Sequence, residues 1–363
     1  MAKLFGLDAN GFSWIYQYLL CIGGLLYTFL GLFFFRKVLL NFFTETITSL
    51  VLITITIGTN YVHHLTLDNL ATVNILFLLT SLVIYHTIEW HKTQRNNQLI
   101  FLMVAVLFSA YVKPSEIFVG LIPLFWNVTS LNEFYKNLLH YLSRWKALTI
   151  GLSISFLFVF PLLFYWHSMT GQWFYDSYKN PGVGLDFHKP HIMNVLFSYR
   201  KGWFVYTPVM IFSLLGFYSL YNLHRKIFIS CLAYFGISLY VISSWTEWWY
   251  GAAFSMRPLI STYPVLGISL GFFLTNLYVK SWHIKLSMII IFPLLILYNQ
   301  FKWWQFRNYI LDPYRMTKEY FWSTFLSTQV TPEKKNYYWW SAILPVGLIL
   351  IIRRIIFGNP WEI

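Results

Sequence analysis

The chain has 363 residues, of which 57% are hydrophobic and only 11% are charged. Soluble domains carry about 25% charged residues, so this composition excludes an ordinary soluble protein. Backbone groups in hydrocarbon are satisfied only within helices or closed barrels, and the apolar runs lack the alternation of strands. We therefore predict an all-α polytopic integral membrane protein. Its formal net charge of +13 is scattered in short clusters, which argues against a nucleic-acid partner.

Apolar runs along the chain predict about 11 transmembrane helices. Their approximate limits are 14–35, 45–60, 70–88, 98–112, 116–130, 147–166, 204–222, 227–244, 259–279, 285–301 and 340–352. The fourth and fifth runs are short and close together, so they are either tilted half-spans or a re-entrant pair. No soluble domain interrupts the series, and we predict a single transmembrane domain over residues 1–363.

Lys and Arg gather in alternate loops, which predicts the orientation of the chain. The clusters are Arg36-Lys37, Lys92 with Arg95, Arg144 with Lys146, Arg225-Lys226, Lys280 with Lys285, and Arg353-Arg354. Because cytoplasmic loops retain positive charge, we assign these loops and the C-terminus to the cytoplasm. Three larger loops, 167–203, 245–258 and 302–339, then lie on the outer side with most of the loop Trp, Tyr, Asp and His. We expect the last of them to be an interfacial cover.

An aromatic segment at an outer membrane boundary, residues 245–258, carries Glu247, Trp248, Trp249 and Arg257. One interpretation is an aromatic belt with an arginine that reaches the headgroups. The other is a sugar-phosphate site, because aromatic faces pack on sugar C–H surfaces and a guanidinium binds a phosphate group through two parallel hydrogen bonds.

A second outer cluster, residues 198–208, places Arg200 and Lys201 just before the predicted span 204–222, which contains Tyr206. Two cations on the outer side run against the positive-inside trend. They are either anchors to lipid headgroups or part of a specific phosphate site.

Other charged side chains near the outer boundary have simpler interpretations. Asp68 follows His63 and His64 in the turn 61–69, where its carboxylate is either a base or ligand or the cap of a turn. Lys113 and Glu116 flank a proline, and we expect them to pair with each other.

Metal ligands are not indicated. The stretch that contains Asp186, His188 and His191 lacks helical His spacing and further acidic partners, so no metal site is predicted. Cys21 and Cys231 both lie in apolar runs and are interpreted as small hydrophobic residues.

Several local patterns occur together in one order along the chain. They are Ala2 to Asp8 before a span, Gly58-Thr59-Asn60 at the end of the next, Val112-Lys113-Pro114, Arg200 to Pro208, and Trp248 to Pro258. In this order the chain resembles the bacterial multi-spanning GT-C glycosyltransferases, the group with the protein O-mannosyltransferase-like and aminoarabinose-transferase-like enzymes. The resemblance covers roughly residues 1–280.

The resemblance implies an extracytoplasmic-face glycosyltransferase of the bacterial cytoplasmic (inner) membrane. Such an enzyme transfers a sugar from a polyprenyl-phosphate-linked donor to a glycan, lipid or protein acceptor. The enzyme itself is surrounded by membrane lipids. By position, Arg257, Arg200 and Lys201 would bind the donor phosphate. Trp248, Trp249 and Tyr206 would line the sugar or lipid pocket, and Glu247 or Asp68 would supply the catalytic carboxylate. The cofactor is unknown, and the resemblance leaves a divalent metal open without a sequence signature for one.

The chain departs from these relatives at its beginning. In relatives a first helix and a carboxylate-bearing outer loop precede the segment that looks like residues 2–8. Eleven spans with a cytoplasmic C-terminus also place Met1 outside, so both observations suggest a truncated or inactive form. Two alternatives remain open: a lipid-linked glycan transporter or flippase, and a non-catalytic membrane partner of a glycan assembly complex.

Overall fold

The computed structural model describes residues 6, 13–175, 182–278 and 280–329. Over these residues the chain forms helices and no strand, apart from one isolated bridge between Leu185 and Trp245. The α-helices are α1 (Trp14–Leu39), α2 (Glu45–Ile57), α3 (Tyr61–Thr66), α4 (Thr72–Thr93), α5 (Asn96–Val112), α6 (Leu121–Leu124), α7 (Leu131–Ser143), α8 (Trp145–Thr170), α9 (Ile192–Phe197), α10 (Trp203–Tyr206), α11 (Ile211–Leu223), α12 (Arg225–Ser243), α13 (Tyr263–Tyr278), α14 (Trp282–Arg307) and α15 (Lys318–Ser323). Short 3₁₀ helices occupy Pro114–Gly120, Pro208–Met210 and Arg257–Thr262.

Among the residues that the structure describes, six helical segments are long and apolar enough to cross a membrane. They are Trp14–Leu39, Thr72–Thr93, Trp145–Thr170, Arg225–Ser243, Arg257–Leu277 and Trp282–Arg307. Shorter apolar helices lie at Glu45–Ile57, Asn96–Val112, Pro114–Leu124 and Pro208–Leu223. At 1.5 Å per residue a 13-residue helix such as α2 is only about 20 Å long, shorter than a hydrocarbon core of about 30 Å.

The predicted spans agree with these helices in part. Each of the first ten predicted spans overlaps an apolar helix, although 116–130 is only a 3₁₀ helix followed by the single turn of α6. The eleventh, 340–352, lies outside the described residues. The all-α membrane fold is therefore confirmed, and the number of eleven spans stays a prediction.

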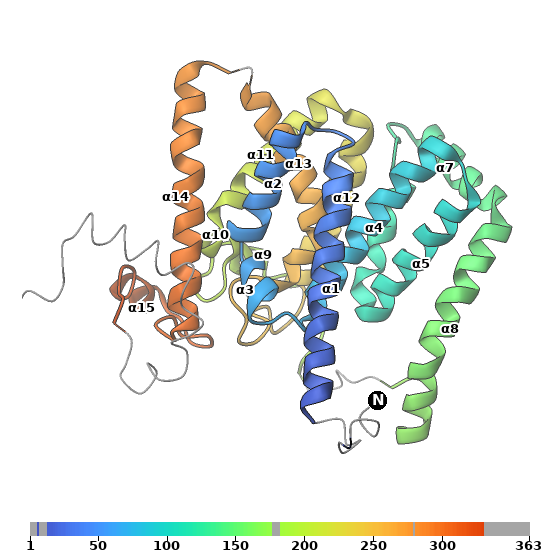
Figure 1. Ribbon diagram of the computed structural model, residues 1–363, viewed down its shortest axis with the longest axis horizontal. Helices are drawn as coiled ribbons and strands as arrows, with labels where there is room; N and C mark the ends of the chain where they lie inside the picture. Colours follow the sequence, from blue (N-terminus) through green and yellow to red (C-terminus); the bar gives the residue numbers. More distant parts are fainter. Residues whose placement is uncertain (1–5, 7–12, 176–181, 279, 330–363) are drawn as a thin grey trace, which may run out of the picture.

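The bundle is built around α13, which packs against α1, α2, α4, α11, α12 and α14. In Figure 1, α14 and α8 stand at opposite edges of the bundle. Most of α13 is buried, whereas α8 and α14 expose apolar side chains such as Phe156, Phe164 and Leu294. Such exposure is costly in water and is the expected outer surface of a bundle surrounded by lipid.

Helix α11 approaches α13 closely at Gly216. A Cβ at this position would lie 2.1 Å from the carbonyl oxygen of Ser269. The Ser269 hydroxyl also donates a 2.6 Å hydrogen bond to the carbonyl oxygen of Ser213 on the facing helix. Small residues that admit a facing backbone, together with hydrogen bonds between helices, are typical of packing in membranes.

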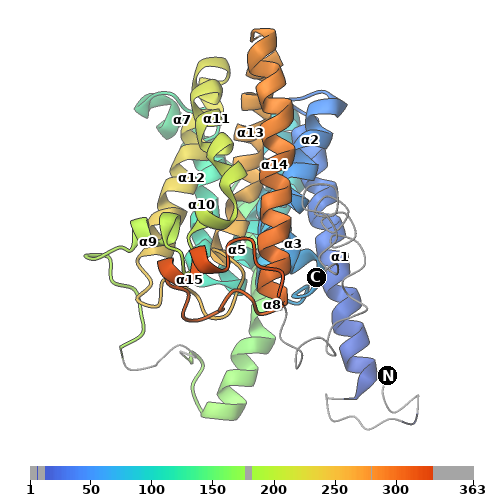
Figure 2. The same cartoon turned by 90° about the vertical axis from the view of Figure 1, so that its left-hand side faces the viewer.

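The two ends of the bundle differ in their loops. The α1–α2, α4–α5, α7–α8, α11–α12 and α13–α14 connections lie together at what we call the basic end (Figure 1), and the clusters from Arg36-Lys37 to Lys280 with Lys285 lie in or next to them. Figure 2 shows α3, α9 and α15 at the opposite end, which we call the loop end. The structure thus places the five described basic clusters at one end, as predicted, whereas Arg353-Arg354 lies outside the described residues and the cytoplasmic location of the basic end stays a prediction.

Three loops contain helices that the sequence did not predict. The turn 61–69 holds α3, the loop 167–203 holds α9, and the basic-end connection after residue 130 holds α7. Helix α14 also continues past the predicted limit at residue 301 to Arg307. The serine at position 130 begins α7 by accepting a hydrogen bond from the Glu133 amide, a capping signal that the sequence did contain.

The cover expected over the outer side is present at the loop end within the described residues 308–329. Its helix α15 buries Phe321 against Tyr206 and Tyr199. Beneath it lies Lys302, which donates hydrogen bonds to the side-chain oxygen of Gln305 and the carbonyl oxygen of Phe325. This segment therefore packs on the bundle and has a buried side.

Candidate functional site

A cavity of about 680 Å³ opens at the loop end of the bundle. Its polar and aromatic lining residues are Asp68, Thr72, Lys113, Ser115, Trp245, Tyr250 and Arg257. Apolar side chains of α4 and α12, including Leu76 and Val241, complete the wall. The cavity thus combines one carboxylate, two cations and two aromatic rings with an apolar side.

Asp68 follows α3, whose position depends on the break after α2. The buried amide of Asn60 accepts a hydrogen bond from the Tyr263 hydroxyl and donates one to the carbonyl oxygen of Phe254. Four residues after His64, Asp68 lies on the same side of the turn, with its Oδ2 3.0 Å from His64 Nδ1. The carboxylate therefore has a fixed partner on the inner side and faces the cavity on the other.

Burial and nearby charge set the protonation states around Asp68. Burial alone would raise the pKa of Asp68, but the close contact with His64 and the positive charge of Arg257 outweigh it and lower the pKa. Burial lowers the pKa of His63 to about 3, helped by the charges of Lys201 and Arg257, and burial also lowers the pKa of His64 despite the contact with Asp68. Asp68 is thus ionised and both histidines are neutral near neutral pH.

Arg257 enters the cavity because residues 245–258 form a tight loop. Tyr250, Gly251 and Ser255 have φ values of 50°, 70° and 54°, in the left-handed region that non-glycine residues seldom adopt. The loop returns so that Arg257 Nη2 donates to the Tyr250 carbonyl oxygen at 3.4 Å. Two strained non-glycine residues at one place fit a loop that holds a functional side chain.

A second loop forms the outer wall of the cavity. Backbone bonds join Thr246 to Gly184 at 2.9 Å and Asp186 to Ser244 at 2.7 Å. These pairs hold residues 182–186 alongside the start of the 245–258 loop. This loop lines the cavity with Val183, Gly184 and Leu185, whereas its Asp186, His188 and His191 are not among the lining residues.

Lys113 reaches the cavity from the junction after α5. Its Nζ lies 3.3 Å from Glu116 Oε1, so the expected pairing is confirmed. The carboxylate of Glu116 is buried and also accepts hydrogen bonds from Ser261 at 3.2 Å and Tyr234 at 3.3 Å. Glu116 thus anchors Lys113, whose side chain remains 30% exposed.

The three cations predicted for a donor phosphate have different surroundings. Arg257 lines the cavity, whereas Arg200 and Lys201 do not. Lys201 is buried and donates to the Ala253 carbonyl oxygen, and burial followed by repulsion from Arg200 and Arg257 lowers its pKa to about 7. Arg200 has its guanidinium carbon 3.9 Å from the ring centre of Trp249. Their phosphate role stays a prediction.

The other aromatic and acidic candidates, Trp248, Trp249, Tyr206 and Glu247, do not line the cavity. Trp248 and Trp249 flank Arg200, and Tyr206 is buried against Phe254. Glu247 is exposed and close enough to Arg200 to affect its protonation. The rings that do line the cavity are Trp245 and Tyr250, which belong to the same predicted segment.

The sequence contained signals for two residues that it did not assign to the site. The four-residue spacing of His64 and Asp68 on a helical turn places both on one side. The Lys113-Pro114 junction placed a cation at the membrane boundary, but its proximity to Arg257 depends on long-range packing. In the described part of the chain no group of three His, Cys, Asp or Glu side chains could hold a metal ion.

Comparison of the chain with protein-family models, with curated proteins and with solved structures finds no match. Its class therefore follows from composition and architecture. The described residues form an all-helical bundle with six helices able to cross a membrane and apolar side chains on its periphery. The chain is a multi-pass α-helical membrane protein.

Proposed function

We propose that this protein is a GT-C-like glycosyltransferase that uses a polyprenyl-phosphate-linked sugar at the extracytoplasmic face of a bacterial inner membrane. The observation that supports this proposal is the loop-end cavity, where Asp68, Lys113 and Arg257 meet beside Trp245 and Tyr250. A carboxylate, a pair of cations and aromatic rings are the groups that an acceptor, a phosphate and a sugar require.

Asp68 is the proposed general base. An ionised carboxylate removes the proton from an acceptor hydroxyl while that oxygen attacks the anomeric carbon of the donor sugar. The bond from the anomeric carbon to the phosphate oxygen breaks, and its electron pair leaves with the lipid phosphate. His64 holds the Asp68 carboxylate at 3.0 Å and helps to keep it ionised, so it is a positioning residue.

Arg257 and Lys113 are the proposed phosphate ligands. Both are fixed before any ligand arrives, Arg257 by the Tyr250 carbonyl and Lys113 by Glu116. Preorganised cations stabilise the charge that develops on a leaving phosphate with little rearrangement. The apolar wall around Leu76 and Val241 would accept the first part of a polyprenyl chain.

Transfer of radiolabelled hexose from a polyprenyl-phosphate hexose, measured with purified protein in lipid nanodiscs, tests this proposal. Arg257→Ala is expected to lower kcat/KM at least about tenfold, equivalent to about 1.4 kcal/mol. Asp68→Asn is expected to lower kcat about a hundredfold or more with a smaller change in KM. Arg315→Ala is the matched control, because Arg315 is an exposed arginine at the same end that does not line the cavity.

Equal losses in Arg257→Ala and Arg315→Ala would contradict the phosphate assignment. Binding of the donor lipid without transfer, in a protein that co-purifies with an active transferase, would favour the non-catalytic partner. Movement of the intact lipid-linked sugar between leaflets without transfer would favour the transporter. Both outcomes overturn the proposed activity while retaining the cavity as a binding site.

A further inference from the structure

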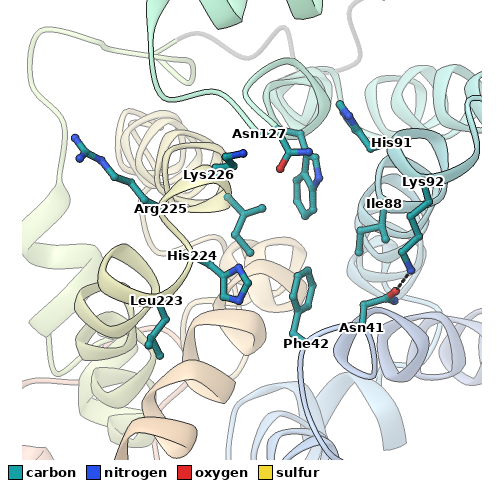
Figure 3. A pocket seen from close by; sticks show the side chains of 12 residues that line it. Asn41, Phe42, Ile88, His91, Lys92, Asn127, Leu223, His224, Arg225 and Lys226 are labelled. Carbon is teal, nitrogen blue, oxygen red and sulfur yellow. Dashed lines mark hydrogen bonds between the residues drawn. The ribbon is translucent and has the colours of Figure 1, made fainter.

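A second pocket, of about 460 Å³, lies at the basic end of the bundle, opposite the loop-end cavity. Figure 3 shows this pocket from close by. It is formed where the end of α4 meets the α11–α12 junction and the segment after α6. Its polar lining includes Asn41, His91, Lys92, Asn127, Arg225 and Lys226. Its lining contains three cationic side chains and no carboxylate, so it favours a negatively charged group.

Each lysine of the pocket has one acidic neighbour outside the lining, Glu89 for Lys92 and Glu133 for Lys226. In Figure 3 the Lys92 ammonium points to the Asn41 side chain, and a hydrogen bond joins them. Lys92 also lies 3.6 Å from Glu89, while half of its side chain is exposed. Lys226 points toward Asn127 in the same view. The Arg225 guanidinium is turned toward Tyr221, 5.3 Å from its ring centre, and defines the pocket's edge.

Helix α12 adds a favourable field to the pocket. It has 19 residues and begins at Arg225. The carbonyl oxygen of the preceding residue, His224, accepts hydrogen bonds from the amides of Ile227 and Phe228. The N-terminus of a helix carries partial positive charge and amides that can bind an anion. Lys92 and Lys226 therefore converge on the same pocket as a helix N-terminus.

Helix α7 indicates that this pocket is at the level of lipid headgroups. Its exposed apolar residues, Leu131, Tyr135, Leu139 and Leu142, recur every three or four positions and so form one stripe. On its other side Asn137 donates to the carbonyl oxygens of Pro123 and Leu124. A helix with one packed face and one exposed apolar face is typical of a segment that lies in the membrane interface.

Helix α7 is also joined directly to the pocket wall. The Tyr141 hydroxyl lies 3.2 Å from His91 Nε2, and Asn137 makes a 3.4 Å hydrogen bond to the carbonyl oxygen of Trp126. Both partners line the pocket. The pocket must therefore lie at the same depth as the interfacial helix beside it.

We propose that the basic-end pocket binds a phosphate group, held by Lys92 and Lys226 at the N-terminus of α12, and that an anionic phospholipid supplies it. Basic pockets between transmembrane helices on the positively charged side of a membrane protein suit lipid headgroups. A soluble phosphate has the same chemistry and is the alternative source. This site is on the opposite end from the loop-end cavity and does not depend on the glycosyltransferase proposal.

Native mass spectrometry of the full chain in detergent, titrated with phosphatidylglycerol or phosphatidylcholine, tests the proposal. We expect one phosphatidylglycerol to bind about tenfold more tightly than phosphatidylcholine, which is equivalent to about 1.4 kcal/mol. The double variant Lys92→Gln/Lys226→Gln should lose this preference. The matched double variant Lys146→Gln/Lys280→Gln removes the same charge from the basic end outside the pocket and should retain it.

A second variant tests the pocket with its lysines intact. Asn127→Asp places a carboxylate in the lining and should weaken phosphatidylglycerol binding by a similar factor. A parallel titration with inorganic phosphate, read as a Tm shift, separates the two sources. Protection by phosphate that is lost in the Lys92/Lys226 double variant would support a phosphate site filled from solution. Equal phosphatidylglycerol preference in both double variants would overturn the proposal.

Discussion

We expect the protein to become less stable as the pH is lowered, because burial keeps His63 in its neutral form. The His63 ring packs beside Phe306 and Phe254, and its Nδ1 accepts a 3.3 Å hydrogen bond from the Trp303 indole. An indole N–H can only donate, so His63 Nδ1 must be unprotonated in the folded state. Protonation of Nδ1 would break this hydrogen bond, and no carboxylate among the described residues contacts that nitrogen to compensate. Burial lowers the pKa of His63 from 6.5 to about 3.

The magnitude follows from the difference between folded and unfolded pKa values. Above pH 6.5 the histidine is neutral in both states and its contribution is fully present. As pH falls from 6.5 toward 3, the unfolded chain binds a proton that the folded chain does not, so stability is lost. At pH 5 the loss is about 2 kcal/mol, or several degrees in Tm. His64, whose pKa is also lowered, adds to the same trend.

Thermal unfolding of the detergent-solubilised protein, followed by tryptophan fluorescence between pH 7.5 and 5, measures this effect. His63→Asn keeps an acceptor near the position of Nδ1 but cannot titrate, so its Tm should fall less over this range than that of the wild type. His167→Asn is the matched control, because His167 lies at the exposed end of α8 and stacks on Trp173, which is itself exposed. If His63→Asn and the wild type lose the same number of degrees, the assignment of the pH dependence to His63 is wrong.

Two further predictions concern packing and buried charge. Gly216→Ala should destabilise the protein by about 1–3 kcal/mol, because the added Cβ would meet the α13 backbone. Gly236→Ala is the control, since a Cβ there would meet nothing within 4 Å, and it should change the stability by less than about 1 kcal/mol in the same melting assay. Lys113→Met should destabilise by at least about 2 kcal/mol because it leaves the buried Glu116 carboxylate without its cation. Adding Glu116→Gln should restore most of that loss in a double-mutant cycle, and additive losses would contradict the coupling.

The helical architecture was predictable because it depends on local properties. Apolar runs and the absence of alternation gave the helices, and the distribution of lysine and arginine gave the two ends. The short helices α3 and α7 were missed because their apolar content is below that of a span. For α7 a capping serine and a stripe of apolar residues were nevertheless present in the sequence.

The candidate site was less predictable because it depends on which way neighbouring side chains point. Arg200 and Lys201 are adjacent in sequence, yet Lys201 is buried and Arg200 stacks on Trp249. Arg257 and Lys113 are separated by more than a hundred residues and line one cavity. Sequence order identified the segments that reach the loop end, but only the packing of α3, α4 and α12 decides which side chains share a space.

Lys201 illustrates how a cation outside the cavity still shapes it. Its ammonium donates to the Ala253 carbonyl oxygen, inside the loop that turns back at Tyr250 and delivers Arg257. Because burial and the neighbouring arginines lower its pKa to about 7, this hydrogen bond involves a lysine that is only partly charged at neutral pH. Lys201 can therefore hold the loop without adding a third full positive charge to those of Arg257 and Lys113. These two cavity cations are then the ones that interact with an incoming anion.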